Sequence, residues 1–253
     1  MDPRTAIIDE RLKNVRNVIA VSSGKGGVGK TLVASVLALI LARNGYKVGF
    51  FDLDFTSPSS HVVLNIGNEQ PKEEKGIVPP QIHGLRFMSV VYYSAGRASS
   101  LRGSETSDAF IELLAVTKWG NLDYLILDMP PGIGDVTLDL LRFVQNVKFL
   151  IVTTPSRLAF ETVGKLLDLL RETKNPVVGV IENMQTQEST WIRSQVEAKG
   201  FSYLGALPFD SELEQNIGNI DGLLNTQFGK NLKKIIENLF LKNAFLEKRK
   251  VGC

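Results

Sequence analysis

VIAVSSGKGGVGKTLVASVLALI, residues 18–40, is the stretch that decides the fold of this chain. Residues 18–23 form a short apolar run that ends in two serines, which predicts a buried β-strand. Four glycines follow within the next six residues, and residues 30–44 then form an apolar stretch of helical length. Because a strand that leads through a glycine-rich turn into a helix is the repeating unit of α/β proteins, we expect an open parallel sheet.

The turn itself, Gly24-Lys25-Gly26-Gly27-Val28-Gly29-Lys30-Thr31, fits the phosphate-binding pattern G-x-x-x-x-G-K-[ST]. Glycines let the backbone lie close to phosphate groups, so that its N–H groups and the N-terminus of the helix face the anion. Lys30 is then expected to reach the β- and γ-phosphates, and the Thr31 hydroxyl to hold Mg²⁺. These eight residues and Leu32 are the predicted nucleotide-binding loop. A glycine-rich turn in an unrelated fold is the alternative.

A second lysine, Lys25, stands early in this loop, although Lys30 alone suffices to hold the phosphates of one nucleotide. From this position Lys25 is placed to cross to the nucleotide of another subunit. A cation delivered in this way stabilises the charge that develops during phosphoryl transfer, as an arginine finger does. The alternative is that Lys25 is a solvated loop residue.

Three acidic residues stand at the ends of two predicted strands that follow the loop. Asp52 and Asp54 close the segment FFDLD, and Asp128 closes DYLILD. Because ligands of open α/β sheets lie beyond the carboxyl ends of the strands, all three are expected to face the loop. Asp128 and Asp52 are predicted to hold Mg²⁺ directly or through water, and Asp54 to orient an attacking water. The alternative is that each acid caps a turn or helix.

The remainder of the chain alternates in the same way, which predicts one α/β domain over residues 1–253: a mostly parallel sheet covered by helices on both faces, in three layers. Residues 67–84, rich in proline, glycine and charge, are predicted to be an exposed connection. The predicted strands are 18–23, 47–53, 85–91, 123–128, 147–153, 177–183 and 201–206, and the predicted helices 30–44, 106–118, 134–145, 158–173, 188–199, 211–218 and 225–241.

Each end of the chain carries an amphipathic segment. Residues 4–16 have apolar residues at helical spacing, which predicts a helical arm that either packs on its own domain or reaches outward. Residues 225–253 predict a helix followed by a basic tail, KRK at 248–250. That helix either covers the sheet or lies on a membrane surface.

Composition narrows the classes of function. The net charge of +2 gives no argument for a nucleic-acid partner. A single cysteine, Cys253, makes an intramolecular disulfide or a cysteine cage within one chain impossible, and the two histidines, His61 and His83, have no ligand spacing. With no signal-peptide core or apolar run of spanning length, a cytoplasmic location is expected.

With these motifs in view, residues 17–240 resemble the MinD/Mrp branch of deviant P-loop ATPases. The resemblance implies ATP and Mg²⁺ as ligands and a dimer that sandwiches two nucleotides, with Lys25 contacting the partner's ATP. It also implies that Asn183 recognises adenine and that Leu207, Pro208 and Phe209 lie against the base. ATP is favoured over GTP because the guanine motif N-K-x-D is absent. The segments that carry the resemblance are KGGVGKT at 25–31, FDLDFTSPS at 51–59, RGS at 102–104, WGNLDYLILDMPPGIGD at 119–135 and IENM at 181–184.

Two departures from that pattern affect the expected role. Iron–sulfur carriers of the Mrp type usually have a C-x-x-C pair after the segment matching IENM, where this chain has Gln185-Thr186-Gln187-Glu188. Ser57 also stands where the family usually has glycine. Over its whole length the chain most resembles archaeal Mrp/MinD-type HypB proteins, which implies nickel insertion into hydrogenase alongside the metallochaperone HypA. An iron–sulfur cluster carrier and a MinD-like membrane-associated positioning ATPase are the alternatives.

Overall fold

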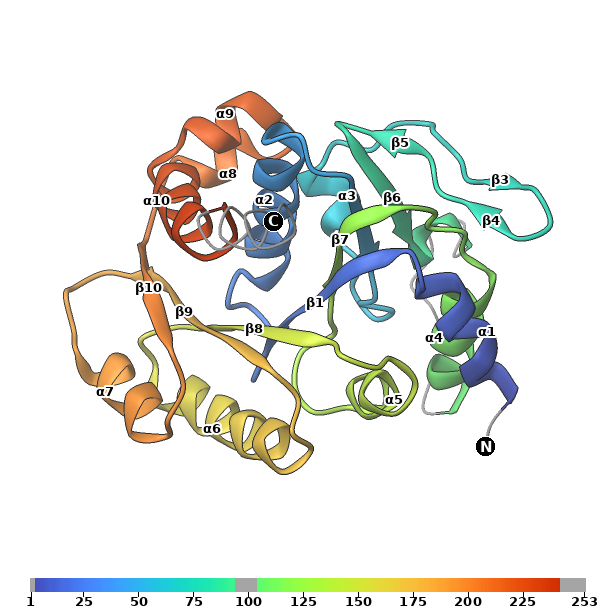
Figure 1. The fold of residues 1–253 in the computed structure, drawn as a ribbon. Coiled ribbons are helices and arrows are strands. Elements are labelled where there is room, and N and C mark those ends of the chain that lie inside the picture. Colours follow the sequence, from blue (N-terminus) through green and yellow to red (C-terminus); the bar gives the residue numbers. More distant parts are fainter. Residues whose placement is uncertain (1–2, 94–103, 242–253) are drawn as a thin grey trace, which may run out of the picture.

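A computed structural model describes residues 3–93 and 104–241 of the chain. Its main sheet has eight strands in the order β10-β9-β8-β1-β7-β2-β6-β5, and every neighbouring pair is parallel except β5 and β6 (Figure 1). All seven predicted strands are present. The strands are β1 (Val15–Ser23), β2 (Val48–Asp52), β5 (Gln81–Ile82), β6 (Leu85–Ser89), β7 (Leu122–Asp128), β8 (Lys148–Thr153), β9 (Val177–Gln185) and β10 (Tyr203–Pro208).

Helices cover both faces of this sheet, as predicted. On each face, side chains of the helices and of the sheet pack together in a buried apolar cluster. Helices α2, α9 and α10 lie on one face, and α1, α4, α5, α6 and α7 on the other (Figure 1). The helices are α1 (Pro3–Leu12), α2 (Lys30–Arg43), α3 (Ser60–Val63), α4 (Ser104–Val116), α5 (Asp135–Phe143), α6 (Arg157–Glu172), α7 (Trp191–Ala198), α8 (Leu213–Asn216), α9 (Ile220–Asn225) and α10 (Gln227–Ile236).

The central strand β1 shows why its sequence is an unbroken apolar run. Val18 and Ala20 point into the cluster on the α5 and α6 face, whereas Ile19 and Val21 point into the cluster beneath α2. Side chains alternate between the two faces of a strand, so a strand that is covered on both faces has no polar side.

The predicted connection at 67–84 contains more structure than expected. Strands β3 (Lys72–Glu73) and β4 (Ile77–Val78) form a small antiparallel hairpin, and β5 adds an edge to the main sheet. The predicted strand at 85–91 ends earlier, at Ser89, because the Ser89 hydroxyl accepts a hydrogen bond from the Val91 backbone N–H and starts a 3₁₀ turn over Val90–Tyr92.

The two ends of the chain also require corrections. The predicted helix at 4–16 stops at Leu12, because Val15 already pairs with Leu122 in the sheet. This helix packs on its own domain, where Arg4 pairs with Asp108 of α4 at 3.1 Å. The predicted helix at 225–241 corresponds to α10 followed by a π-helical turn over Glu237–Leu241, and the short helix α9 before it was not predicted. Thr226 separates α9 from α10, because its hydroxyl caps α10 by accepting the Gly229 N–H at 3.0 Å.

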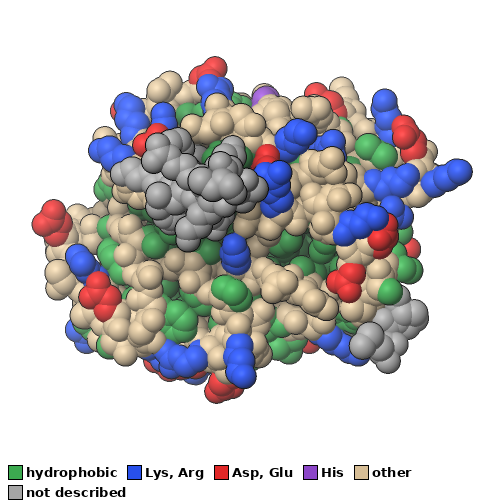
Figure 2. All heavy atoms as spheres, in the orientation of Figure 1, with side chains coloured by type: hydrophobic (Ala, Val, Ile, Leu, Met, Phe, Trp, Pro, Cys, Tyr) green, Lys and Arg blue, Asp and Glu red, His purple; other side chains and the backbone are tan. Residues whose placement is uncertain are grey.

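Other predicted helices are shorter than expected: α7 begins only at Trp191, and α8 has a single turn. Residues 242–253, which include the basic tail and Cys253, lie outside the described residues, as does most of the RGS segment at 102–104. In the described ranges, no helix is both long enough and apolar enough to cross a membrane. On the face drawn in Figure 2, basic and acidic side chains are interspersed.

Burial of α10 decides between the two readings of the C-terminal helix for its described part. Phe228, Leu232 and Ile236 are all within 1% of complete burial in the cluster beneath α2. The apolar face of α10 therefore covers the sheet and is not free to lie on a membrane.

Replacing Phe228 by alanine is expected to lower the free energy of unfolding by about 3–5 kcal/mol, because the buried ring would leave a cavity. Lys230→Ala, on the exposed side of the same helix, is the control and is expected to change it by less than about 0.5 kcal/mol. Urea unfolding of both variants measures the difference. Equal stability of the two variants would contradict a structural role for α10.

Candidate functional site

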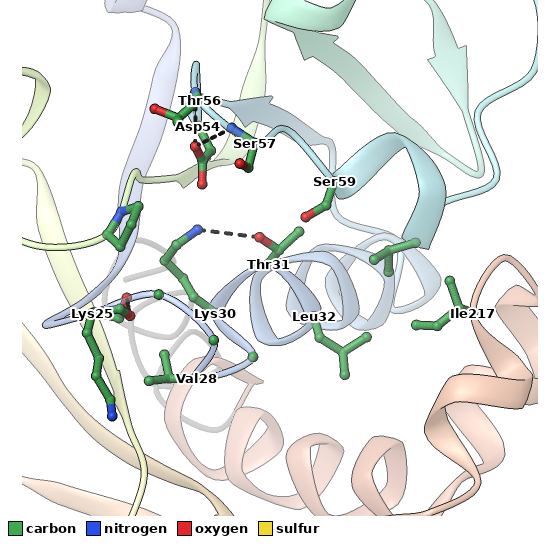
Figure 3. Close-up of a pocket in the computed structure, with 16 residues that line it drawn as sticks. Lys25, Val28, Lys30, Thr31, Leu32, Asp54, Thr56, Ser57, Ser59 and Ile217 are labelled. Atoms are coloured by element: carbon green, nitrogen blue, oxygen red, sulfur yellow. Dashed lines mark hydrogen bonds between the residues drawn. The ribbon is translucent and has the colours of Figure 1, made fainter. Parts of the chain in front are cut away.

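A cavity of about 560 Å³ opens at the carboxyl edge of the sheet, over the N-terminus of α2 (Figure 3). The loop at 24–31 forms its floor, and the segment after β2 forms its opposite wall. Gly29 precedes α2 with φ of 78°, in the left-handed region that favours glycine. The cavity is lined by Ser23, Lys25, Gly26, Gly27, Val28, Gly29, Lys30, Thr31, Leu32, Asp54, Thr56, Ser57, Ser59, Val63, Pro131 and Ile217.

The two lysines of the loop face different ways. Lys30 points toward Asp54 and Ser57, whereas the Lys25 side chain extends away from this group (Figure 3). Lys30 is almost fully buried and Lys25 is exposed. The structure thus separates a lysine inside the site from a lysine directed outward. This placement fits both the predicted contact with another subunit and the solvated alternative, so the role of Lys25 stays a prediction.

Lys30 forms a buried ion pair with Asp128, whose side chain has no exposed area. The pairing follows from the sheet, because β1 and β7 run parallel with Val21 beside Asp128. Burial raises the pKa of Asp128, and the charge of Lys30 opposes that rise. Without a nucleotide, each group therefore serves as the counter-ion of the other.

Asp52 lies on the next strand, in register with Asp128, and is also fully buried. Its carboxylate accepts hydrogen bonds from the Ser60 hydroxyl and from the Asp54 backbone N–H, the latter at 3.1 Å. Burial, followed by repulsion from Asp128, raises the pKa of Asp52 from 3.8 to about 7. Two adjacent buried carboxylates therefore favour an additional proton or a cation between them.

These residues fit Mg²⁺, which prefers hard oxygen ligands and takes several of them from water and nucleotide phosphates. The Thr31 hydroxyl belongs to the cavity lining, whereas Asp128, paired with Lys30, and the neighbouring Asp52 are fully buried and do not line it. These three residues are the ones that would supply oxygen atoms to the ion. Within the described ranges, no group of three or more His, Cys, Asp or Glu side chains is arranged to hold a metal without such help.

Asp54, predicted to orient water, caps its own turn. Its Oδ1 accepts the backbone N–H groups of Thr56 at 3.2 Å and Ser57 at 3.0 Å. Asp54 also lines the cavity, so its position is compatible both with capping the turn and with orienting a water molecule. Its predicted part in hydrolysis stays a prediction.

The residues implied to surround the base lie at the ends of β9 and β10, but they do not line the cavity. Asn183 is 2% exposed, and its amide Nδ2 donates to the Val28 carbonyl at 2.9 Å. Leu207 is fully buried, whereas Phe209 is 62% exposed. The structure brings Asn183 to the phosphate loop and leaves Phe209 facing outward.

Sequence reasoning missed part of the cavity wall. Thr56, Ser57 and Ser59 add hydroxyl groups, and the run of small polar residues after FFDLD was an available signal for them. Val63 and Ile217 add apolar surface. Ile217 comes from a segment far along the chain that packs beside α2, and no local pattern points to it.

Comparison with known proteins places this geometry in a family. The family model described as "ParA: NUBPL iron-transfer P-loop NTPase" matches residues 14–242, which is nearly the whole described chain. The chain belongs to this NUBPL-type family of P-loop NTPases. Family membership agrees with the resemblance to the MinD/Mrp branch that the motifs indicated.

Curated relatives carry names from iron–sulfur chemistry. An iron–sulfur cluster carrier protein of Pseudomonas fragi is 43% identical over 177 residues, covering 68% of this chain and 62% of that protein. A protein of the same name from Aquifex aeolicus is 36% identical over 222 residues, covering 81% of this chain and 61% of its own length. This chain thus spans about three fifths of the length of these relatives.

Solved structures agree on the fold. A nucleotide-binding protein of Archaeoglobus fulgidus in complex with ADP is 29% identical, with a TM-score of 0.73 and coverage of 87% of this chain and 92% of that one. MinD of Pyrococcus horikoshii with Mg-ADP has a TM-score of 0.67 and coverage of 88% and 96%, but is only 19% identical and bears on the fold alone.

The raised pKa of Asp52 predicts that stability depends on pH in the absence of Mg²⁺ and nucleotide. Below pH 3.8 Asp52 is protonated in both folded and unfolded chains, whereas above about pH 7 both are ionised. Between these values only the folded protein keeps the proton, so its free energy of unfolding falls as pH rises, by on the order of 4 kcal/mol in total.

Asp52→Asn, which cannot ionise, is expected to remove this contribution. Urea unfolding gives the free energy of unfolding of wild type and variant at about pH 4 and about pH 8. The contribution of Asp52 is the change between these two pH values in the wild type minus the same change in the variant. A gap between the two proteins that stays constant with pH would contradict the assignment.

Proposed function

We propose that this chain is a Mg²⁺-dependent ATPase that works as a dimeric switch in the transfer of iron–sulfur clusters. The observation that carries the cluster assignment is 36–43% identity to two proteins named iron–sulfur cluster carrier, within a family described as iron-transfer NTPases. The loop at 24–31 and the buried carboxylates beside it support the proposed binding of nucleotide.

ATP is the proposed ligand of the cavity. The phosphates would lie on the N–H groups of the loop at the N-terminus of α2, with Lys30 turning from Asp128 to the β- and γ-phosphates. Bound Mg²⁺, held by Thr31 with Asp52 and Asp128 close by, would neutralise phosphate charge. Asp54, at the opposite wall, is proposed to hold the attacking water. The ADP bound to the Archaeoglobus protein supports the choice of nucleotide.

A second subunit is proposed to face the same edge of the sheet. Lys25 extends outward there (Figure 3), and of the eight large apolar side chains exposed in the described ranges, five belong to the ends of strands or to the segments after them. One lies near the end of β9, two lie in the loops that follow β7 and β10, and two lie in α5 and α6, the helices after β7 and β8. Exposed apolar groups beside an outward cation suit a closed two-fold interface in which each subunit gives and receives the same lysine. The five residues are Ile133, Leu138, Leu158, Met184 and Phe209.

The cluster is proposed as cargo whose cysteine ligands come from another chain. Clusters of the common kinds are held by four thiolates, and two copies of this chain supply only two cysteines. The segment after Asn183 contains Gln185, Thr186, Gln187 and Glu188, and none of these is a thiolate. The donor set therefore does not fit a cluster held by this chain alone, and the proposed role is to control a cluster-bearing partner.

Nickel insertion, the main expectation from the sequence, has weaker support than the iron–sulfur role that stood there as an alternative, and so has the membrane alternative. The two relatives are named iron–sulfur cluster carrier proteins and not HypB, so they support neither nickel insertion nor a HypA partner. The MinD-like alternative has a shared fold at 19% identity, and the apolar face of α10 is buried.

Lys25→Ala is expected to keep ATP binding, because Lys25 points away from Lys30 and the cavity floor remains intact. It is expected to lose association in a slowly hydrolysed ATP analogue and to lower the hydrolysis rate by about a hundredfold or more, as loss of a charge-stabilising cation does. Lys30→Ala is expected to lose ATP binding itself.

Calorimetry and sedimentation velocity on both variants test this pair, with Lys72→Ala on the distant β3–β4 hairpin as the control for loss of a lysine. A wild type that stays monomeric when saturated with the analogue, or a Lys25→Ala variant that associates equally well, would overturn the dimeric switch.

Trapping the ATP-bound form is expected to retain the cluster-bearing partner. Asp54→Asn should bind ATP without hydrolysing it, so an anaerobic affinity purification with ATP should recover iron and acid-labile sulfide above the level obtained with Lys25→Ala. Metal analysis of the two eluates measures this. Enrichment of nickel without iron and sulfide would contradict the iron–sulfur assignment and support the nickel alternative.

A further inference from the structure

Asn183 at the end of β9 makes a contact with the phosphate loop that base recognition does not explain. Its amide Nδ2 donates to the backbone carbonyl of Val28 at 2.9 Å, and the side chain is 2% exposed. The two residues are 155 positions apart in sequence. A buried polar side chain is stable only when it is hydrogen-bonded, so this contact accounts for the burial of the amide.

The contact constrains a peptide group that matters for phosphate binding. In a trans peptide the carbonyl and the following N–H point in opposite directions. Asn183 does not line the cavity and holds the Val28 carbonyl from outside it. The N–H of Gly29, on the other side of the same peptide, therefore points away from Asn183, and Gly29 lines the cavity where phosphates are expected.

Gly29 is matched to this arrangement. A Cβ atom at this position would lie 2.3 Å from Asn183 Nδ2, and the backbone φ of 78° is one that side chains disfavour. Only glycine therefore allows the amide to approach the Val28 carbonyl so closely. The requirement for glycine at this point of the loop comes from the tertiary contact as well as from the turn.

We propose that Asn183 is a positioning residue for phosphate binding: its amide holds the Val28–Gly29 peptide so that the Gly29 N–H donates to the phosphates. The inference rests on the proposed binding of ATP at this loop and adds to the base recognition that family resemblance implies. It predicts that Asn183 affects ligands that have no base at all.

The polarity of the amide is part of the proposal. Val28 offers a carbonyl, which only accepts hydrogen bonds, so the nitrogen of the Asn183 amide must face it. Aspartate has nearly the same shape but would place an acceptor against an acceptor. Asn183→Asp is therefore expected to release the peptide, whereas Asn183→Ala removes the contact without adding charge.

Inorganic triphosphate in the presence of Mg²⁺ is the probe, with ATP measured in parallel by calorimetry. Asn183→Ala is expected to weaken triphosphate binding about tenfold, the effect of losing one well-aligned donor to a charged group. Asn183→Asp is expected to weaken it further. Gln185→Ala and Gln185→Glu, two residues along the same strand end, are matched controls for truncation and for added charge.

A loss of triphosphate affinity in Asn183→Ala but not in Gln185→Ala supports the proposal, whether or not ATP affinity falls further. Unchanged triphosphate affinity with weakened ATP binding overturns it, because Asn183 would then act on the base alone. Failure of the wild type to bind either ligand would instead overturn the proposed function.

Thermal unfolding establishes that the variants are folded. Where neither Asn183 variant folds, the proposal is tested in ¹⁵N-glycine-labelled wild type by the chemical shift of the Gly29 amide. A large shift on addition of triphosphate is expected. A Gly29 amide that does not respond, while other glycines of the loop do, overturns the proposal.

Discussion

The buried ion pair between Lys30 and Asp128 is the interaction around which the site is arranged. Neither group is stable alone in this position, because an unpaired charge taken out of water costs several kcal/mol. The parallel pairing of β1 and β7 brings Asp128 beside the end of β1, and α2 brings Lys30 back over it. The phosphate loop is therefore held between two elements of the core before any nucleotide arrives. In the proposed ATP complex the phosphate groups would replace Asp128 as the partner of Lys30, so binding would exchange one ion pair for another.

Asp52 links that exchange to metal binding. It lies beside Asp128, and in the absence of a cation it keeps a proton up to near-neutral pH. A divalent cation beside both carboxylates would replace the proton, because both neutralise the same repulsion. Asp52 also holds the Ser60 hydroxyl and the Asp54 backbone N–H, so the segment that forms the opposite wall is tied to the same carboxylate. The charge state of this pair and the conformation of the wall are thus coupled through direct hydrogen bonds.

The carboxyl edge of the sheet combines two kinds of surface with different uses. Its centre is charged and concave, as phosphate and Mg²⁺ require. Exposed apolar side chains come from the end of β9 and from the segments that follow β7, β8 and β10, and Lys25 extends outward from the loop (Figure 3). An edge of this composition suits a nucleotide in the centre and a protein surface around it. The chain is similar to iron–sulfur carriers but has a single cysteine. Under the proposed function, the apolar part of this edge would therefore be the surface that contacts a cluster-bearing partner.

Much of this could be predicted from the sequence because the relevant signals are local. The loop at 24–31 has its glycines and lysine at fixed spacing, and the strands are apolar runs bounded by polar turns, so fold class, the seven main strands and the loop were all predictable. The ends of elements were less predictable. The N-terminal helix stops at Leu12 because of a pairing with a distant strand, and the cap at Thr226 separates α10 from α9, a short helix that was not predicted. Only the tertiary structure decided that Asp128 pairs with Lys30, that Ile217 reaches the cavity, and that Asn183 holds the carbonyl of Val28. Each of these contacts joins residues that are far apart in the sequence and that come together only when the sheet forms. The spacing of residues along the chain therefore does not predict them.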